Sequence, residues 1–449
     1  MRYWLACLFI STSFTARSQQ VIKEYEIREK YFLDDVELLS FEDTLIVNLS
    51  LRFQGVSQLA TFLVPRDMSF LSMPNLHGTN KNAICGVESL PGGIKRFYYA
   101  DQAKSKFTIQ AIEADFKKRS TIDFPGELVL NGKMLTMLTD DNQVVIFSYD
   151  KGTIYEVVID GLKASSKKSY QLPESMTSVN ARDVTLCVEG DHVGVVEAKS
   201  NLKIFLNDEW ITAVHDNSGY SSTHTAVTRF ERSSGKVVTQ TIPTKGKFSS
   251  TILDTLVYRT INGKSAFKLE IFGVNSASKI HEYNIAALPA NEEQLVYFRE
   301  GRANTIGKIE TLKHMMKTSP ACEPFVVAQY QGNTTVLTWG TYFDDNGAMG
   351  PGGLDPITGM AKMIIGTTIK QITPGPGVSR YFYLQGNLND GFTLNDNSDC
   401  LRARVDAFET AQQKDAATKR KSYFKINGDI VAAYYLSKSN KLIFVKFSR

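Results

Sequence analysis

Glycine and aspartate are concentrated in one stretch, FDDNGAMGPGGLDPITGM from Phe343 to Met360, which holds five glycines and three aspartates. Residues of these types can cradle a phosphate or ligate a metal ion. A phosphate loop needs a strand before the glycines and a helix after them, with a Gly-Lys-Ser/Thr triplet in the common case. The segment that follows, Met360 to Ile369, has the pattern of a strand and lacks the triplet. The stretch therefore does not predict a phosphate site.

Oxygen-bearing side chains in this stretch raise the question of calcium. Asp344, Asp345, Asn346 and Asp355 do not follow the D-x-D-x-D-G spacing of a calcium loop. No metal site is predicted, although a calcium ion held by backbone carbonyls is compatible with the sequence. The segment from Asp355 to Gly359 (DPITG) has the residue types of a tight turn. The residues from 344 to 353 are then expected to form a long loop.

Aromatic side chains come just before this loop. An exposed aromatic face can stack on a sugar ring or anchor a protein partner, and long loops often carry function. The sequence therefore predicts ligand contact through Trp339, Tyr342, Asp344, Asp345 and Asn346. The alternative is that the aromatic residues pack in the core.

Signatures of catalysis are missing from the sequence. It contains neither G-x-S-x-G nor H-E-x-x-H, and His215, His224 and His281 are isolated. A pair of catalytic carboxylates is defined by its separation in space, which a sequence does not give. The catalytic residues of any activity are thus unknown, and the sequence favours a role other than catalysis.

Strand patterns dominate the chain that must position these residues. Runs rich in Val, Ile, Thr, Phe and Tyr are bounded by turn residues. Examples are Thr44 to Phe53, Val144 to Tyr149, Thr153 to Ile159, Phe267 to Phe272 and Leu442 to Phe447. Helical patterns are predicted only within Asn284 to Gly301 and for an insertion over 401–421. The sequence predicts an all-β fold.

An aromatic strand, a polar turn and a β-branched strand recur along the chain. The six copies are Leu51 to Pro65, Arg96 to Ile112, Val145 to Ile159, Lys203 to Val214, Glu270 to Ile285 and Ala433 to Phe447. Repeats of roughly 45–65 residues with about four strands each are typical of β-propeller blades, which predicts roughly six to eight blades. A multi-domain β-sandwich is the alternative. Asn-Gly pairs at 131–132, 262–263 and 427–428 are typical of hairpin turns, because both positions accept positive φ.

The first eighteen residues have the features of a secretory signal. Arg2 precedes a short apolar run from Tyr3 to Phe14, and Ala16 and Ser18 are small residues at the positions that precede a cleavage site. A membrane span needs about 20 apolar residues, and no later run reaches that length. The sequence predicts a signal peptide over 1–18, one propeller-like domain over 19–449, no transmembrane segment, and a secreted, periplasmic or cell-surface location.

The net charge argues against one class of partner, and the cysteines leave the disulfide pairing open. The formal charge is +4 and becomes +2 once Arg2 and Arg17 are removed with the signal peptide. Such a balance gives no general attraction to nucleic acid. Four cysteines remain, Cys85, Cys187, Cys322 and Cys400; they form no C-x-x-C pair, and their pairing cannot be read from the sequence.

Three functions are compatible with these features. The first is an exported binding or interaction protein that contacts a glycan or a protein partner through one loop face. The second is a hydrolase or lyase that acts on extracellular polysaccharide. The third is a structural component of a cell-surface or secretion assembly. Fold alone does not separate them.

Overall fold

The structure is a computed structural model of the 449-residue chain. It describes residues 19–27, 32–41, 44–53, 56–65, 71–72, 84–103, 105–115, 117–118, 120–140, 143–189, 200–218, 223–262, 267–284, 296–300, 305–310, 323–331, 334–344, 379–388, 394–396, 421–426, 429–436 and 440–447. The chain divides into two compact units, one with residues 1–81, 366–370 and 398–449, the other with residues 82–365 and 371–397. The single domain expected over 19–449 stays a prediction.

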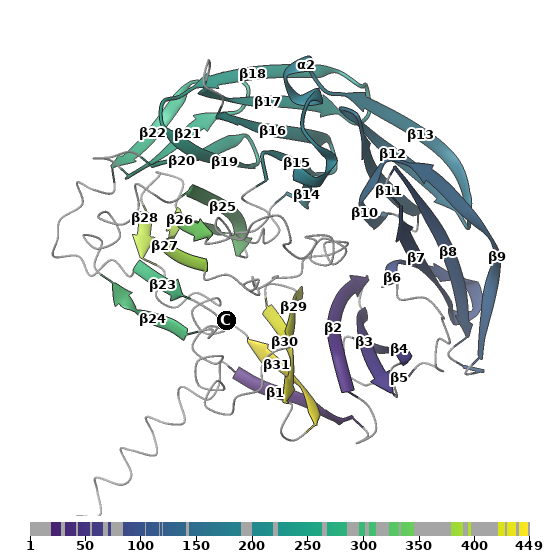
Figure 1. The fold of residues 1–449 in the computed structure, drawn as a ribbon. Coiled ribbons are helices and arrows are strands. Elements are labelled where there is room, and N and C mark those ends of the chain that lie inside the picture. The colour runs from purple at the N-terminus through teal and green to yellow at the C-terminus, as the bar shows by residue number, and fades with distance from the viewer. Residues whose placement is uncertain are drawn as a thin grey trace, which may run out of the picture. The chain divides into compact units, whose positions relative to one another are not determined.

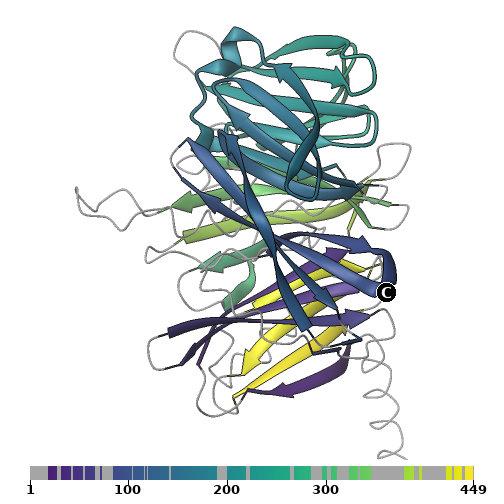
Figure 2. The same ribbon diagram turned by 90° about the vertical axis from the view of Figure 1, so that its right-hand side faces the viewer.

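The first unit joins the two ends of the chain in one sheet. Its strand order is β1 (Gln19–Glu26), β31 (Lys441–Phe447), β30 (Asp429–Leu436) and β29 (Lys421–Ile426). β1 runs antiparallel to β31, from Gln19 opposite Phe447 to Glu26 opposite Lys441. Figure 2 shows the first strands of the chain, in purple, beside the last ones, in yellow. A second sheet contains β2 (Phe32–Phe41), β3 (Thr44–Phe53), β4 (Val56–Pro65) and β5 (Leu71–Ser72).

The second unit contains five sheets, which follow one another in chain order (Figure 1). The first has β6 (Ile84–Leu90), β7 (Ile94–Gln102), β8 (Lys106–Asp115) and β9 (Ser120–Asn131), and the second β10 (Lys133–Asp140), β11 (Gln143–Asp150), β12 (Thr153–Asp160) and β13 (Lys163–Gln171). The third has β14 (Val184–Val188), β15 (Leu202–Leu206), β16 (Trp210–Ser218), β17 (Thr223–Glu231) and β18 (Val237–Pro243). The fourth has β19 (Lys247–Leu253), β20 (Leu256–Asn262), β21 (Phe267–Gly273) and β22 (Lys279–Asn284). The fifth has β23 (Val296–Glu300), β24 (Thr305–Glu310), β25 (Glu323–Gln331), β26 (Thr334–Asp344), β27 (Ser379–Leu388) and β28 (Leu394–Asp396).

Helices are scarce in the described part of the chain. They are α2 (Glu174–Thr177) and the short 3-10 turns η2 (Pro91–Gly93) and η3 (Ala181–Asp183). None of these helices is long and apolar enough to cross a membrane.

The sheets are built as propeller blades are built. Most are meanders of antiparallel strands that follow one another in sequence, and β14 is an exception that pairs parallel with β15. The described residues form seven such sheets, within the expected range of six to eight. The all-β, propeller-like fold is therefore confirmed.

All six predicted hairpins are present. Five of them form the second and third strands of their sheets, as β3–β4, β7–β8, β11–β12, β15–β16 and β30–β31 do. The copy that begins at Glu270 forms the third and fourth strands, β21 and β22. The repeat is therefore shifted by one strand in that sheet.

Two local predictions are corrected by the structure, and two others fall mostly outside the described residues. Asn131 and Gly132 do not form a hairpin turn but connect two sheets, since β9 pairs with β8 while β10 pairs with β11. Gly132 has φ +89°, and a Cβ there would lie 2.5 Å from the carbonyl oxygen of Tyr149, so this connection requires glycine.

The helix expected within Asn284 to Gly301 is wrong over β23, which pairs with β24 and β27. The loop expected over 344–353 begins with Asp344, the last residue of β26, and its other residues lie outside the described ones. The insertion expected to be helical over 401–421 is described only at Lys421, which begins β29.

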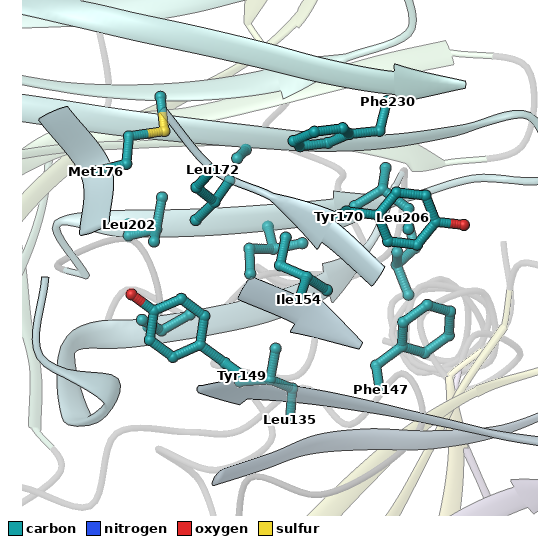
Figure 3. Close-up of a cluster of buried hydrophobic side chains, with 14 of the residues drawn as sticks. Leu135, Phe147, Tyr149, Ile154, Tyr170, Leu172, Met176, Leu202, Leu206 and Phe230 are labelled. Atoms are coloured by element: carbon teal, nitrogen blue, oxygen red, sulfur yellow. The ribbon is translucent and has the colours of Figure 1, made fainter. Parts of the chain in front are cut away.

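One hydrophobic core of the second unit lies between the sheets β10–β13 and β14–β18 (Figure 3). Its members include Phe147, Tyr149 and Ile154 from the first sheet and Leu202 and Phe230 from the second. Each such side chain contributes roughly 1.5–3 kcal/mol when it is fully buried. Inner strands such as β11 are buried on both faces, because a neighbouring sheet covers each face, whereas the outer strand β13 is exposed at every position except Tyr170.

Candidate functional site

The predicted ligand contact around Trp339 falls on β26. Trp339 is 2% exposed and packs with Tyr258, Leu269, Val326 and Leu337 in the core between neighbouring sheets. Its indole ring therefore has no exposed face on which a ligand could stack. This agrees with the alternative that the aromatic residues pack in the core. Within the described residues its Nε1 atom has no hydrogen-bond partner.

The other predicted contacts are only partly described. Tyr342 lies on β26 opposite Glu323 of β25 and Tyr381 of β27, and Asp344 is the last residue of β26. Asp345 and Asn346 lie outside the described residues. The ligand contact predicted for these four residues stays a prediction.

A different part of the second unit holds a cavity. It has a volume of about 230 Å³ and is lined by Gln143, Val145, Glu156, Val158, Ser166, Lys168 and Arg232. Ligand pockets for drug-sized molecules range from about 300 to 1,000 Å³. A cavity of the size found here therefore suits one sugar ring or one side chain of a partner.

Three neighbouring strands position most of the lining. Val145 of β11 lies opposite Val158 of β12, which lies opposite Ser166 of β13. Glu156 lies opposite Lys168 in the next row. Side chains alternate between the faces of a sheet, so residues two positions apart on each strand point to the same side. The alternation therefore places all five side chains on one face.

A β-bulge interrupts this face beside the cavity. The register of β12 and β13 shifts between Val158 and Ile159, so Ser165 is left without an opposite residue. The Ser165 hydroxyl donates a hydrogen bond to the carbonyl oxygen of Val158 at 3.1 Å. Bulges bend a strand and re-aim its side chains, and they are frequent next to functional sites.

Arg232 forms the wall of the cavity from the neighbouring sheet, in the turn after β17. Its Nη2 atom donates to Glu156 Oε1 at 2.9 Å, and its guanidinium lies over the Phe147 ring at 5.9 Å. The Nη1 atom donates to the carbonyl oxygens of Asn207 and Asp208 at 3.4 and 3.3 Å. The arginine is thereby fixed at both ends of its guanidinium group.

Glu156 is a buried carboxylate with two partners. Tyr170 donates its hydroxyl to Oε2 at 2.7 Å, while Arg232 holds Oε1. Burial alone would raise the pKa of Glu156, but the hydrogen bonds from Arg232 and Tyr170 outweigh burial and lower it. Burial and the hydrogen bond to Glu156 raise the pKa of Tyr170, which keeps its proton. The cavity therefore contains an ionised carboxylate that cannot serve as a general acid near neutral pH.

The arrangement is suited to binding polar molecules. Glu156 and the Gln143 amide offer acceptors, while Ser166, Lys168 and Gln143 offer donors. Val145 and Val158 supply an apolar floor. Glu156 is the one carboxylate among the described residues of the lining, whereas glycoside hydrolysis needs two.

The sequence contained weak signals for these residues. Glu156 interrupts the β-branched strand TIYEVVI, and Lys168 lies in the polar run KASSKK. Arg232 belongs to the segment ERSSG, whose residue types are those of a tight turn. Nothing in the sequence shows that this turn reaches the neighbouring sheet.

Comparisons with known proteins add little beyond the architecture. No protein-family model matches the sequence, and no curated protein matches it. Among solved structures, the chain is similar to a subtype N10 neuraminidase-like protein of A/little yellow-shouldered bat/Guatemala/060/2010, at 7% identity and a TM-score of 0.30 over 82% of this chain and 99% of that one. The β-propeller domain of the trilobed protease from Pyrococcus furiosus matches at 9% identity and a TM-score of 0.32 over 69% of this chain and 81% of that one. The WD40 domain of SCAP from fission yeast matches at 8% identity and a TM-score of 0.31 over 81% of this chain and 98% of that one. At these TM-scores the likenesses carry no argument about function.

Proposed function

We propose that the protein is an exported binding protein that holds a polar group of a glycan or protein partner in the cavity on β11, β12 and β13. The composition of the cavity is the observation that carries the proposal. Donors from Ser166, Lys168 and Gln143 converge on an apolar floor, and the one carboxylate of the described lining is held by Arg232 and Tyr170. Export rests on the signal-like residues 1–18 of the sequence.

Hydroxylated ligands suit this lining better than apolar ones. A sugar ring presents C–H groups on its faces and hydroxyl groups around its rim. The former can rest on Val145 and Val158, and the latter can bond with Gln143, Ser166 and Glu156. Polar groups in a concave site fix the orientation of a ligand in this way.

A glycan array tests the proposal. The labelled mature protein is applied to immobilised neutral and acidic oligosaccharides, and each bound glycan is then incubated in solution with the protein and examined by chromatography. The proposal expects binding to at least one class and an unchanged glycan afterwards. Shorter products would assign hydrolysis instead, and an array without any bound glycan would leave only a protein partner.

Hydrolysis remains a second candidate because of Glu189. This residue follows β14, and burial raises the pKa of its carboxyl group, as a general acid requires. The Oε1 atom is buried without a partner among the described residues, and Asn207 donates to Oε2 at 2.5 Å. Asp254, in the β19–β20 turn, acts on this carboxyl group in two opposed ways, because its backbone N–H lowers the pKa of Glu189 and its carboxylate raises it. If a product appears in the assay above, Glu189→Gln must abolish it for this candidate to stand.

A further inference from the structure

The Lys168 side chain, which lines the cavity, has N–H donors that could bond to a ligand. The Lys168 ammonium carries three N–H groups, and within the described residues one of them bonds to the carbonyl oxygen of Arg232 at 3.1 Å. The other cation, Arg232, is committed to Glu156. The charges of Arg232 and Glu156 offset each other, so Lys168 leaves the cavity with a net positive charge.

Neighbouring polar groups add to the excess of donors. The Ser166 hydroxyl and the Gln143 amide both line the cavity beside Lys168. A carboxylate is the simplest ligand group that accepts several hydrogen bonds and carries one negative charge. One ammonium, one hydroxyl and one amide therefore match one carboxylate.

The site is open toward the edge of the sheet. β13 is the outer strand, and every residue from Lys163 to Ser169 is exposed. Lys163 lies opposite Asp160, and the Lys167 ammonium lies over the Tyr155 ring at 4.3 Å, so Lys168 is the lysine of this strand that points its charge into the cavity. A ligand seated in the cavity can continue past this edge in either direction, as a sugar within a polymer must.

We propose that the cavity binds a pyranose ring that carries a carboxylate, within an acidic polysaccharide, and that Lys168 pairs with that carboxylate. This inference rests on the proposed function and specifies its ligand. The ring lies on Val145 and Val158, and its hydroxyl groups bond with Glu156 and Gln143.

The test compares a short oligogalacturonate with its fully methyl-esterified form, which keeps the ring and the chain length but removes the charge. Isothermal titration calorimetry measures both ligands against the wild-type protein, Lys168→Gln and the control Lys117→Gln. Lys117 is an exposed lysine of another sheet, in the turn after β8. The acid is expected to bind the wild type about tenfold more tightly than the ester.

Lys168→Gln is expected to remove most of that difference, whereas Lys117→Gln keeps it. Equal affinity for the acid and the ester overturns the carboxylate assignment but leaves the proposed binding function intact. No binding of either ligand overturns the acidic saccharide, and the glycan array then decides the proposed function separately. An equal loss in both lysine variants places the acid elsewhere on the protein and overturns the role of Lys168.

Discussion

A buried ion pair joins two sheets of the second unit and offers a sharp test of how they are held together. Lys203 of β15 is 2% exposed, and its Nζ atom donates to Asp216 Oδ2 of β16 at 2.9 Å. Nζ also donates to the carbonyl oxygen of Ser250 on β19 at 2.7 Å. Asp216 in turn accepts from the Ser250 backbone N–H at 2.8 Å and from the Thr225 hydroxyl at 3.1 Å. Every described partner in this network is buried.

The expected losses of folding free energy follow from the burial of both charged groups. Asp216→Leu leaves the ammonium of Lys203 buried without its carboxylate, and breaking such a pair costs roughly 3–5 kcal/mol. Lys203→Met leaves the carboxylate buried and is expected to cost about as much. The double variant Lys203→Met with Asp216→Leu leaves no unpaired charge, but the Ser250 N–H loses its acceptor, at about 1–3 kcal/mol. The coupling energy between the two positions is therefore expected to be at least about 3 kcal/mol.

Urea unfolding followed by tryptophan fluorescence measures these free energies. Trp210 and Trp339 belong to the same unit as the ion pair, so they report on its unfolding. The control is the pair Lys268–Glu282 on β21 and β22, whose side chains are 33% and 27% exposed. Its coupling is expected to stay below about 1 kcal/mol. A coupling of that small size for Lys203 and Asp216 would refute the reasoning.

Two further predictions concern the same unit. Burial lowers the pKa of Lys133 to about 8, so the unfolded chain binds more protons than the folded one between pH 8 and the ordinary pKa of lysine. In urea titrations the free energy of unfolding of the wild type should therefore rise by about 1–2 kcal/mol relative to that of Lys133→Met from pH 8 to 9.5. Parallel pH profiles of the two proteins would contradict this. Gly152 has φ +82°, and a Cβ there would lie 2.5 Å from Thr177 Cγ2, so Gly152→Ala should cost about 1–3 kcal/mol in the same titration, whereas an unchanged urea midpoint would show that the turn adapts.

The architecture could be predicted from the sequence because each sheet repeats a local pattern. Aromatic and β-branched residues on both sides of a polar turn define hairpins such as β7–β8 and β11–β12, and these pairings are local. The connection at Gly132 escaped this logic, since positive φ suits a hairpin turn and a passage between sheets equally well. The strand from Val296 to Glu300 falls in a segment that was predicted to hold a helix. It pairs with the adjacent β24 and also with β27, which lies much later in the chain.

The candidate site could not be predicted to the same extent. Glu156 and Arg232 are 76 residues apart in sequence and meet only through the packing of two sheets. Trp339 was expected to contact a ligand, but it is buried. An aromatic residue close to a predicted loop has the same local sequence signal whether its side chain is exposed or buried. Burial depends on the neighbouring sheet, which the sequence of one strand does not reveal.

Filling the cavity on β11, β12 and β13 with a large side chain tests most directly whether a ligand binds there. Ser166→Trp places an indole in the cavity from an exposed position of β13. Ser169→Trp makes the same change on the opposite face of the same strand, at another exposed position. Calorimetry of both variants with a glycan that binds the wild type is the one measurement required. The account predicts at least about a tenfold loss of affinity for Ser166→Trp and wild-type affinity for Ser169→Trp. Wild-type affinity in the Ser166→Trp variant would contradict it.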